Sequence, residues 1–210
     1  MLHTDNHIVS SVLPFPNIYW WSRVMQASSV TFDEGEHFEK RSFRNRYYVA
    51  TAHGVQCLSI PLEKGRGQRS PMGAVQLSYA ENWQKQHWRT LYSAYNRSPY
   101  FEYYKDSLEV IFQTKYLRLV DFNLATIHWL RKQLAIDFEE HATQEYIRTP
   151  VTGTDLRPMR IKHPSFTEEL KYYQVFDSLH GFIPNLSILD LLFNEGRQAV
   201  AYLNRLCHLG

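Results

Sequence analysis

The segment NWQKQHWRTLYSAYNRSPYFEYY (residues 82–104) decides the expected fold, because it holds two aromatic helical patterns separated by a short break. On a helical projection of residues 83–95, the apolar and aromatic side chains fall on one half of the cylinder together with His87, as in a helix packed along one side. After the break, Ser98 predicts an N-cap and Pro99 a first helical position. The second helix is expected to bury Phe101, Tyr104, Leu108, Ile111 and Phe112.

The composition of the chain is that of an ordinary folded protein. Its 210 residues are 44% hydrophobic and carry a formal net charge of +2. No segment approaches the ~20 apolar residues that a membrane-spanning helix needs, and the first residues lack the pattern of a signal peptide. A cytoplasmic location is therefore expected. Cys57 and Cys207 lie far apart and form no metal or redox motif, so we expect free thiols.

The N-terminal part predicts a βαβ unit. Residues 7–15 read as a strand, residues 18–27 as a short apolar helix and residues 30–32 as a second strand. In such a unit, residues 13–19 and the residues after Phe32 share the carboxyl edge of a sheet, where α/β proteins usually bind ligands. The loop contains no glycine-rich phosphate fingerprint, so no dinucleotide site of the familiar kind is expected.

The remaining patterns predict a single α/β domain over residues 1–210, with α+β as the alternative class. A sheet-rich part (1–82) is followed by a helical part (83–146), an irregular connection (147–164) and a helical C-terminal part (165–210). Further strands are expected at residues 47–50 and 55–61 around a turn at Gly54, at 74–79 and at 136–138. Further helices are expected at residues 121–134, with Leu124, Ile127, His128 and Leu134 inside, and at 165–176, 185–196 and 198–206.

A run of acidic residues directly followed by basic ones supports two interpretations. The run contains Asp33, Glu34, Glu36 and Glu39, and then Lys40, Arg41, Arg44 and Arg46. It is either a solvated loop with weak local ion pairs, or an anion-binding cluster formed by Lys40, Arg44, Asn45 and Arg46. The segment 63–73, rich in Gly, Ser and Pro, is either a surface connection or a mobile basic flap over a site.

Four pieces of the chain carry a family resemblance when they are taken in order. They are Leu13-Pro14-Phe15-Pro16; Lys40 and Phe43-Arg44-Asn45-Arg46 leading to Leu58-Ser59-Ile60-Pro61-Leu62; His87-Trp88, Ala94-Tyr95 and Ser98-Pro99-Tyr100-Phe101; and Asn185-Leu186-Ser187-Ile188-Leu189-Asp190. Together they resemble the WbqC-like protein family. Founding members of that family lie among genes for surface polysaccharide such as O-antigen, and a role as glycine (aminoacyl) transferases that modify a sugar has been proposed for them.

The resemblance implies a transferase that moves an aminoacyl or related group in the modification of a surface polysaccharide or nucleotide sugar. Its substrates would be a small anionic donor and a sugar. Other members commonly carry a fuller Gln-Pro-Tyr-Phe-Phe-Pro type of run where this chain has Leu13-Pro14-Phe15-Pro16. If that run shapes a donor pocket, the pocket is altered here.

An enzyme of this kind needs a base, an anion stabiliser and an acceptor pocket. His87 is the candidate general base, because an imidazole titrates near pH ~6.5, although its place within the apolar arc fits a core histidine as well. Asp33 and Glu36 would orient it or an acceptor amine, or are solvated carboxylates. The candidate substrate-binding residues are Lys40, Arg44, Asn45, Arg46, Tyr95, Ser98 and Tyr100. The tyrosines also fit core walls, and Ser98 also fits a helix cap.

No cofactor or metal is expected, since the histidines are scattered and none belongs to an HExxH motif. The competing class is a non-catalytic binding or assembly protein that recognises an anionic ligand or a partner. Nucleic acid is not an expected partner, because acidic residues interleave with the basic ones around Lys40. A deep pocket lined jointly by Arg44, Arg46, His87 and Tyr95 would favour an enzyme, and a broad flat apolar patch would favour an interaction protein.

Overall fold

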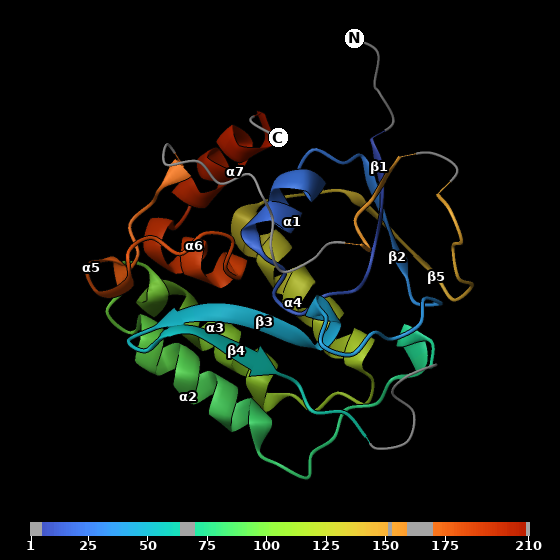
Figure 1. Ribbon diagram of the computed structural model, residues 1–210, viewed down its shortest axis with the longest axis horizontal. Coiled ribbons are helices and arrows are strands. Elements are labelled where there is room, and N and C mark those ends of the chain that lie inside the picture. The colour runs from blue at the N-terminus through green and yellow to red at the C-terminus, as the bar shows by residue number, and fades with distance from the viewer. Residues whose placement is uncertain (1–5, 64–69, 151–152, 159–169, 209–210) are drawn as a thin grey trace.

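The computed structural model describes residues 6–63, 70–150, 153–158 and 170–208 and shows a mixed α/β fold (Figure 1). A parallel sheet lies at one side of the molecule, and helices from the middle and C-terminal parts of the chain form the other side. The expected α/β class is confirmed. Among the described residues, no helix combines the length and the apolar character that crossing a lipid bilayer requires.

The βαβ unit is present as predicted. Strand β1 (His7–Ser10) is followed by helix α1 (Ile18–Val24) and strand β2 (Ser29–Asp33), and the two strands pair in parallel. The Asn17 side chain caps α1 by accepting a hydrogen bond from the backbone N–H of Trp20 at 2.9 Å. The first strand is shorter than expected, because it ends at Ser10 and not at the prolines of positions 14 and 16. Those prolines could not have donated to a sheet ladder in any case.

Two more parallel strands complete the sheet in the order β5-β2-β1-β6. Strand β5 (Glu139–Thr143) pairs with β2, and strand β6 (Thr154–Asp155) pairs with β1. The strand expected at residues 136–138 therefore begins slightly later in the chain. The segment expected to be an irregular connection supplies β6, a strand that is only 2 residues long. Because all strands run in one direction, their carboxyl ends meet at a single edge.

A separate antiparallel hairpin follows the βαβ unit. A 3₁₀ turn, η1 (Phe43–Asn45), leads into β3 (Arg46–Thr51) and β4 (Gly54–Ser59). Gly54 supplies the expected turn geometry with a φ of 94°. The basic loop expected at residues 63–73 lies mostly outside the described residues.

The strand expected at residues 74–79 is absent. A 3₁₀ turn, η2 (Met72–Ala74), stands at its start. Gln76 and Leu77 then make isolated bridges to Arg118 and Leu62. The alternating pattern of this segment therefore reflects backbone contacts with two different segments and not a regular ladder.

The two central helices match the prediction closely. Helix α2 (Trp83–Tyr95) and helix α3 (Phe101–Gln113) meet at a short corner, and all five residues expected on the inner face of α3 are buried. Ser98, however, is not the N-cap of α3, because Tyr100 holds that position. The Ser98 hydroxyl instead donates to the Tyr95 carbonyl at 2.7 Å and closes the end of α2.

Helix α4 (Leu119–Leu134) begins with Asp121 accepting from the backbone of Arg118, as in a capping box. Ile127 and Leu134 are buried as expected, but His128 is exposed and contacts Glu140.

The C-terminal part contains α5 (Asp177–His180), α6 (Ile188–Glu195) and α7 (Gln198–His208). Of the helix expected at residues 165–176, positions 165–169 lie outside the described residues and positions 171–176 are not helical. Helix α7 packs against α1 (Figure 1), so the two ends of the described chain share one cluster of buried apolar side chains that runs from Ile8 to Leu206.

Candidate functional site

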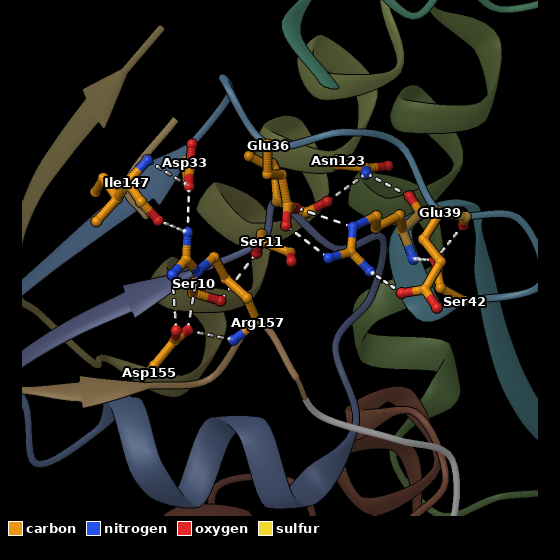
Figure 2. A network of polar contacts seen from close by, with 12 residues as sticks. Ser10, Ser11, Asp33, Glu36, Glu39, Ser42, Asn123, Ile147, Asp155 and Arg157 are labelled. Carbon is orange, nitrogen blue, oxygen red and sulfur yellow. Dashed lines mark hydrogen bonds and ion pairs between the residues drawn. The ribbon is translucent and has the colours of Figure 1, made fainter. Parts of the chain in front are cut away.

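The carboxyl ends of the parallel strands gather a cluster of charged and hydroxyl side chains (Figure 2). Asp33 is the last residue of β2, and Asp155 is the last residue of β6. Ser10 and Ser11 lie at the end of β1, and Glu36 lies shortly after β2. Ligand sites of α/β proteins are usually found at this edge.

Arg157 joins two strands of the sheet through a buried ion pair (Figure 2). Its Nε and Nη2 donate to the two carboxylate oxygens of Asp155 at 2.9 and 2.7 Å, and its Nη1 donates to Asp33 Oδ2 at 2.5 Å. Nη1 also donates to the backbone carbonyl of Ile147. The Asp33 side chain is 0% exposed and that of Arg157 is 8% exposed. Arg157 therefore ties β2, β6 and the segment after β5 together, with each guanidinium nitrogen engaged.

The ionisation of this pair follows from its hydrogen bonds. Burial acts to raise the pKa of the Asp155 carboxyl, but the hydrogen bonds from Arg157 outweigh burial and lower that pKa below its usual value. The hydrogen bond to Asp155 is in turn the main cause that raises the pKa of Arg157. Both groups are therefore charged at neutral pH.

Glu36 and Arg44 form a second ion pair beside the first. Arg44 donates from Nε to Glu36 Oε1 at 3.0 Å and from Nη2 to Glu36 Oε2 at 2.6 Å, and its Nη1 reaches Glu39 at 3.2 Å. Asn123 Nδ2 donates a hydrogen bond to the backbone carbonyl of Arg44 at 2.9 Å, and the Ser42 hydroxyl accepts one from the backbone N–H of Arg44. Burial raises the pKa of Glu36, although Arg44 opposes the increase. The Glu36 carboxylate is thus held in place by Arg44 and has a raised proton affinity.

A cavity of about 340 Å³ opens next to these ion pairs, and we call it the carboxyl-edge cavity. Its lining includes Glu36, Glu39, Arg44, Tyr146, Arg148 and Asp155. Arg148 is exposed and makes no ion pair or hydrogen bond with the described residues. A buried carboxylate with a raised pKa and an exposed cation beside one cavity are the kinds of group that an acid–base site requires.

Gly35 allows one wall of this cavity to close. A Cβ at this position would overlap the backbone of Gln144 and Tyr146. Only glycine lets the segment after β5 pack so closely on the segment after β2. Tyr146 is thereby held at the cavity.

A second cavity of about 480 Å³ lies at the base of the hairpin, and we call it the hairpin-base cavity. Lys40, Arg41, Asn45 and Arg46 line it from one segment, and residues 59–63 line it from another. The expected cluster of Lys40, Arg44, Asn45 and Arg46 is therefore divided between two cavities. Arg44 leaves the cluster because its ion pair with Glu36 draws the guanidinium toward the sheet edge.

His87 lies beneath the hairpin and lines neither cavity. It is 4% exposed, its Nδ1 lies 3.0 Å from the Tyr47 hydroxyl, and its ring packs on Trp83. Burial lowers its pKa from 6.5 to about 4. Side chains alternate along a strand, so Tyr47 and Arg46 point to opposite faces of β3. Neither cavity is therefore the joint pocket of Arg44, Arg46, His87 and Tyr95 that would favour an enzyme. Likewise, Asp33 and Glu36 bond to Arg157 and Arg44 and do not orient His87.

The three candidates at the helical corner also lie apart from both cavities. The Tyr95 hydroxyl donates to Asp190 Oδ1 at 2.8 Å within the core, and the buried Ser98 closes α2. Tyr100 is 43% exposed and lines a separate surface hollow with Tyr103. These residues remain predictions as substrate contacts, and their observed contacts are structural.

Sequence reasoning missed Tyr146, Arg148, Asp155 and Arg157. All four lie in the segment expected to be an irregular connection or directly before it. The strand that positions Asp155 is 2 residues long, too short to produce a periodic pattern. The only local signal was an acid and a base two positions apart in Asp155-Leu156-Arg157.

The proline-rich run at residues 13–16 is buried and lines neither of the two cavities. Phe15 has a φ of 40° and is fully buried, and its ring packs against Tyr47, Phe112 and Phe122. Its backbone N–H donates to Thr126 at 2.9 Å. In this chain the run connects the sheet to the helical core.

Comparison with known proteins adds one family and one relative. Residues 13–163 match the WbqC-like protein family, and this range includes the described lining of both cavities. The chain is also similar to the "Uncharacterized protein Rv1507c" of Mycobacterium tuberculosis (strain H37Rv), with 27% identity over 197 residues that cover 79% of this chain and 83% of the relative. No solved structure matches the chain.

Proposed function

The chain belongs to the WbqC-like protein family, and from this premise we propose that it is a transferase whose active site is the carboxyl-edge cavity. The group transferred would be aminoacyl, such as glycyl, or a related acyl group. The acceptor would be a sugar in a surface polysaccharide, such as O-antigen, or in a nucleotide sugar. A cytoplasmic location is part of the proposal, and fractionation of cells would test it.

The observation that carries the proposal is the position of Glu36. Its side chain is 4% exposed and yet lines a cavity, and burial raises its pKa. Burying a carboxylate is unfavourable unless its charge is compensated, and here Arg44 compensates it with one hydrogen bond to each carboxylate oxygen, which opposes the effect of burial without cancelling it. A carboxylate with a raised pKa accepts protons more readily near neutral pH, as a general base must.

In the proposed reaction, an amine or hydroxyl group of the sugar attacks the carbonyl carbon of an activated acyl donor. A C–N or C–O bond forms, and the bond between the acyl carbon and the leaving group breaks. Glu36 accepts the proton that the nucleophile loses and returns it to the leaving group. Arg44 positions Glu36 through its two hydrogen bonds, and the exposed Arg148 is available to hold a negatively charged part of the donor.

The test is a transfer assay on the purified protein. A nucleotide sugar is incubated with an activated glycyl donor, as a thioester and as an ester, and mass spectrometry detects a product heavier by one glycyl group. Glu36→Gln removes the base but keeps the shape of the side chain, so we expect turnover to fall by about 10²–10⁴-fold. Glu81→Gln makes the same change at an exposed position just before α2 and should leave turnover unchanged. Wild-type turnover in Glu36→Gln would refute the assignment.

The second candidate function is non-catalytic recognition of an anionic ligand or partner. It is favoured by the basic lining of the hairpin-base cavity, which contains Lys40, Arg41 and Arg46. A protein of this kind would bind anions and yield no transfer product with any donor. The same assay, combined with a binding measurement, separates the two functions.

A further inference from the structure

The hairpin-base cavity has polar groups that nothing in the described part of the chain satisfies. Asn45 is 8% exposed, and its Oδ1 has no hydrogen-bond donor among the described residues. The buried Nε–H of Arg46 likewise has no acceptor there. Both residues line the cavity. Buried donors and acceptors are rarely left unmatched in folded proteins, so these two atoms at the wall of a cavity are available to pair with a ligand.

The orientation of the Asn45 amide is determined by its neighbours. Its Nδ2 donates to the backbone carbonyl of Ile60 at 2.9 Å, and the backbone N–H of Ile60 donates to the backbone carbonyl of Asn45 at 2.9 Å. A flipped amide would place two carbonyl oxygens against each other, because Oδ1 can only accept. The unmatched atom is therefore an acceptor, and its complement is a hydroxyl or N–H group of a ligand.

The charges in this cavity call for an anion. Lys40, Arg41 and Arg46 line it, and none of them forms an ion pair with a carboxylate of the described residues. Glu63 is the single acidic residue among the described residues that line it. The Nε–H of Arg46 belongs to a planar group that suits the oxygens of a phosphate. An anionic group and a hydroxyl donor are thus required together.

The remaining lining consists of Ser59 and of four apolar residues, Phe38, Ile60, Pro61 and Leu62. The four apolar residues offer a surface for the carbon-bearing face of a ring. The volume of about 480 Å³ lies within the range of small-molecule sites, roughly 300–1,000 Å³. We therefore propose that the hairpin-base cavity binds a sugar phosphate, with the phosphate at Arg46 and the neighbouring cations and a sugar hydroxyl donating to Asn45 Oδ1. This site is separate from the carboxyl-edge cavity, and its occupation does not depend on Glu36.

The experiment is isothermal titration calorimetry with three probes: glucose 1-phosphate, inorganic phosphate and glucose. Glucose 1-phosphate should bind at least tenfold more tightly than inorganic phosphate, and glucose alone should not bind measurably. Arg46→Gln should weaken glucose 1-phosphate binding by at least tenfold. Lys132→Ala removes one exposed cation on α4 and should change nothing. The absence of glucose 1-phosphate binding, or unchanged affinity in Arg46→Gln, would overturn the proposal.

Asn45→Ala tests the hydroxyl contact. It should reduce the affinity for glucose 1-phosphate to that for inorganic phosphate while the phosphate affinity is kept. Because the substitution also removes the bond to Ile60, a thermal unfolding curve accompanies it, and Arg46→Gln tests the site if this variant does not fold. Equal affinities of the two phosphates in the wild type would overturn the assignment of a sugar. No acyl donor is present in these titrations, so their outcome and that of the transfer assay are independent.

Discussion

Lowering the pH should destabilise the protein through His87. The side chain is 4% exposed, and burial lowers its pKa from 6.5 to about 4. The unfolded chain therefore binds a proton at this imidazole at a higher pH than the folded chain does. The stability that neutral His87 contributes is fully present above pH ~6.5 and is lost as the pH falls toward about 4. The difference in pKa corresponds to about 3 kcal/mol, of which about 2 kcal/mol is lost between pH 7 and pH 5.

Urea unfolding of the wild type and of His87→Gln at about pH 7, 6 and 5 measures this contribution. Subtracting the two free energies of unfolding removes the contributions of other titrating groups. Tyr47, the hydrogen-bond partner, does not titrate in this range because burial raises its pKa. We expect the advantage of the wild type over His87→Gln to shrink by about 2 kcal/mol from pH 7 to pH 5. A difference that stays constant over this range would refute the burial of a neutral imidazole beneath the hairpin.

Three further substitutions test other parts of the structure. Arg157→Met leaves the fully buried Asp33 without its ion-pair partner and should lower the free energy of unfolding by about 3–5 kcal/mol. An unchanged urea midpoint would contradict the role of Arg157 in joining β2 and β6. Gly35→Ala forces the segment after β5 away from the segment after β2 and should cost about 1–3 kcal/mol by the same measurement; a neutral result would mean that the two backbones are not in close contact. Tyr95→Phe removes one hydrogen bond to buried Asp190 and should lower the free energy of unfolding by about 1–3 kcal/mol. Transfer activity per folded molecule should be unchanged. A loss of activity in the folded variant would place Tyr95 at the substrate.

The parts of the fold that the sequence predicted well depend on local patterns. Helices α2 and α3 follow from aromatic residues at helical spacing, and the bounds of α2 agree with the expected range at both ends. The βαβ unit follows from two apolar strands flanking a short apolar helix. Gly54 identified the hairpin because its turn requires a positive φ. In each case the signal and the structure involve the same few residues.

The site depends on contacts between distant segments, and local patterns could not reveal them. Asp33 and Arg157 are separated by 124 positions along the chain. Asp33 and Glu36 were identified as candidate residues, but their partners were not, because the strand that delivers Arg157 is 2 residues long. The sequence leaves open whether the basic run is a solvated loop or one anion-binding cluster, because nothing in it shows that Glu36 pairs with Arg44 and separates it from Arg46. His87 was correctly placed within the apolar face of its helix, and its burial follows from that position.

The most direct test of whether the active site is the carboxyl-edge cavity is the rate of acyl transfer in Glu36→Gln and in His87→Gln. The two variants are compared near pH 7, at a temperature where both are folded. We expect Glu36→Gln to lose about 10²–10⁴-fold in kcat and His87→Gln to lose no more than its reduced folded fraction explains. The reverse result, a large fall in kcat for folded His87→Gln with Glu36→Gln at the wild-type rate, would contradict the assignment and move the active site beneath the hairpin.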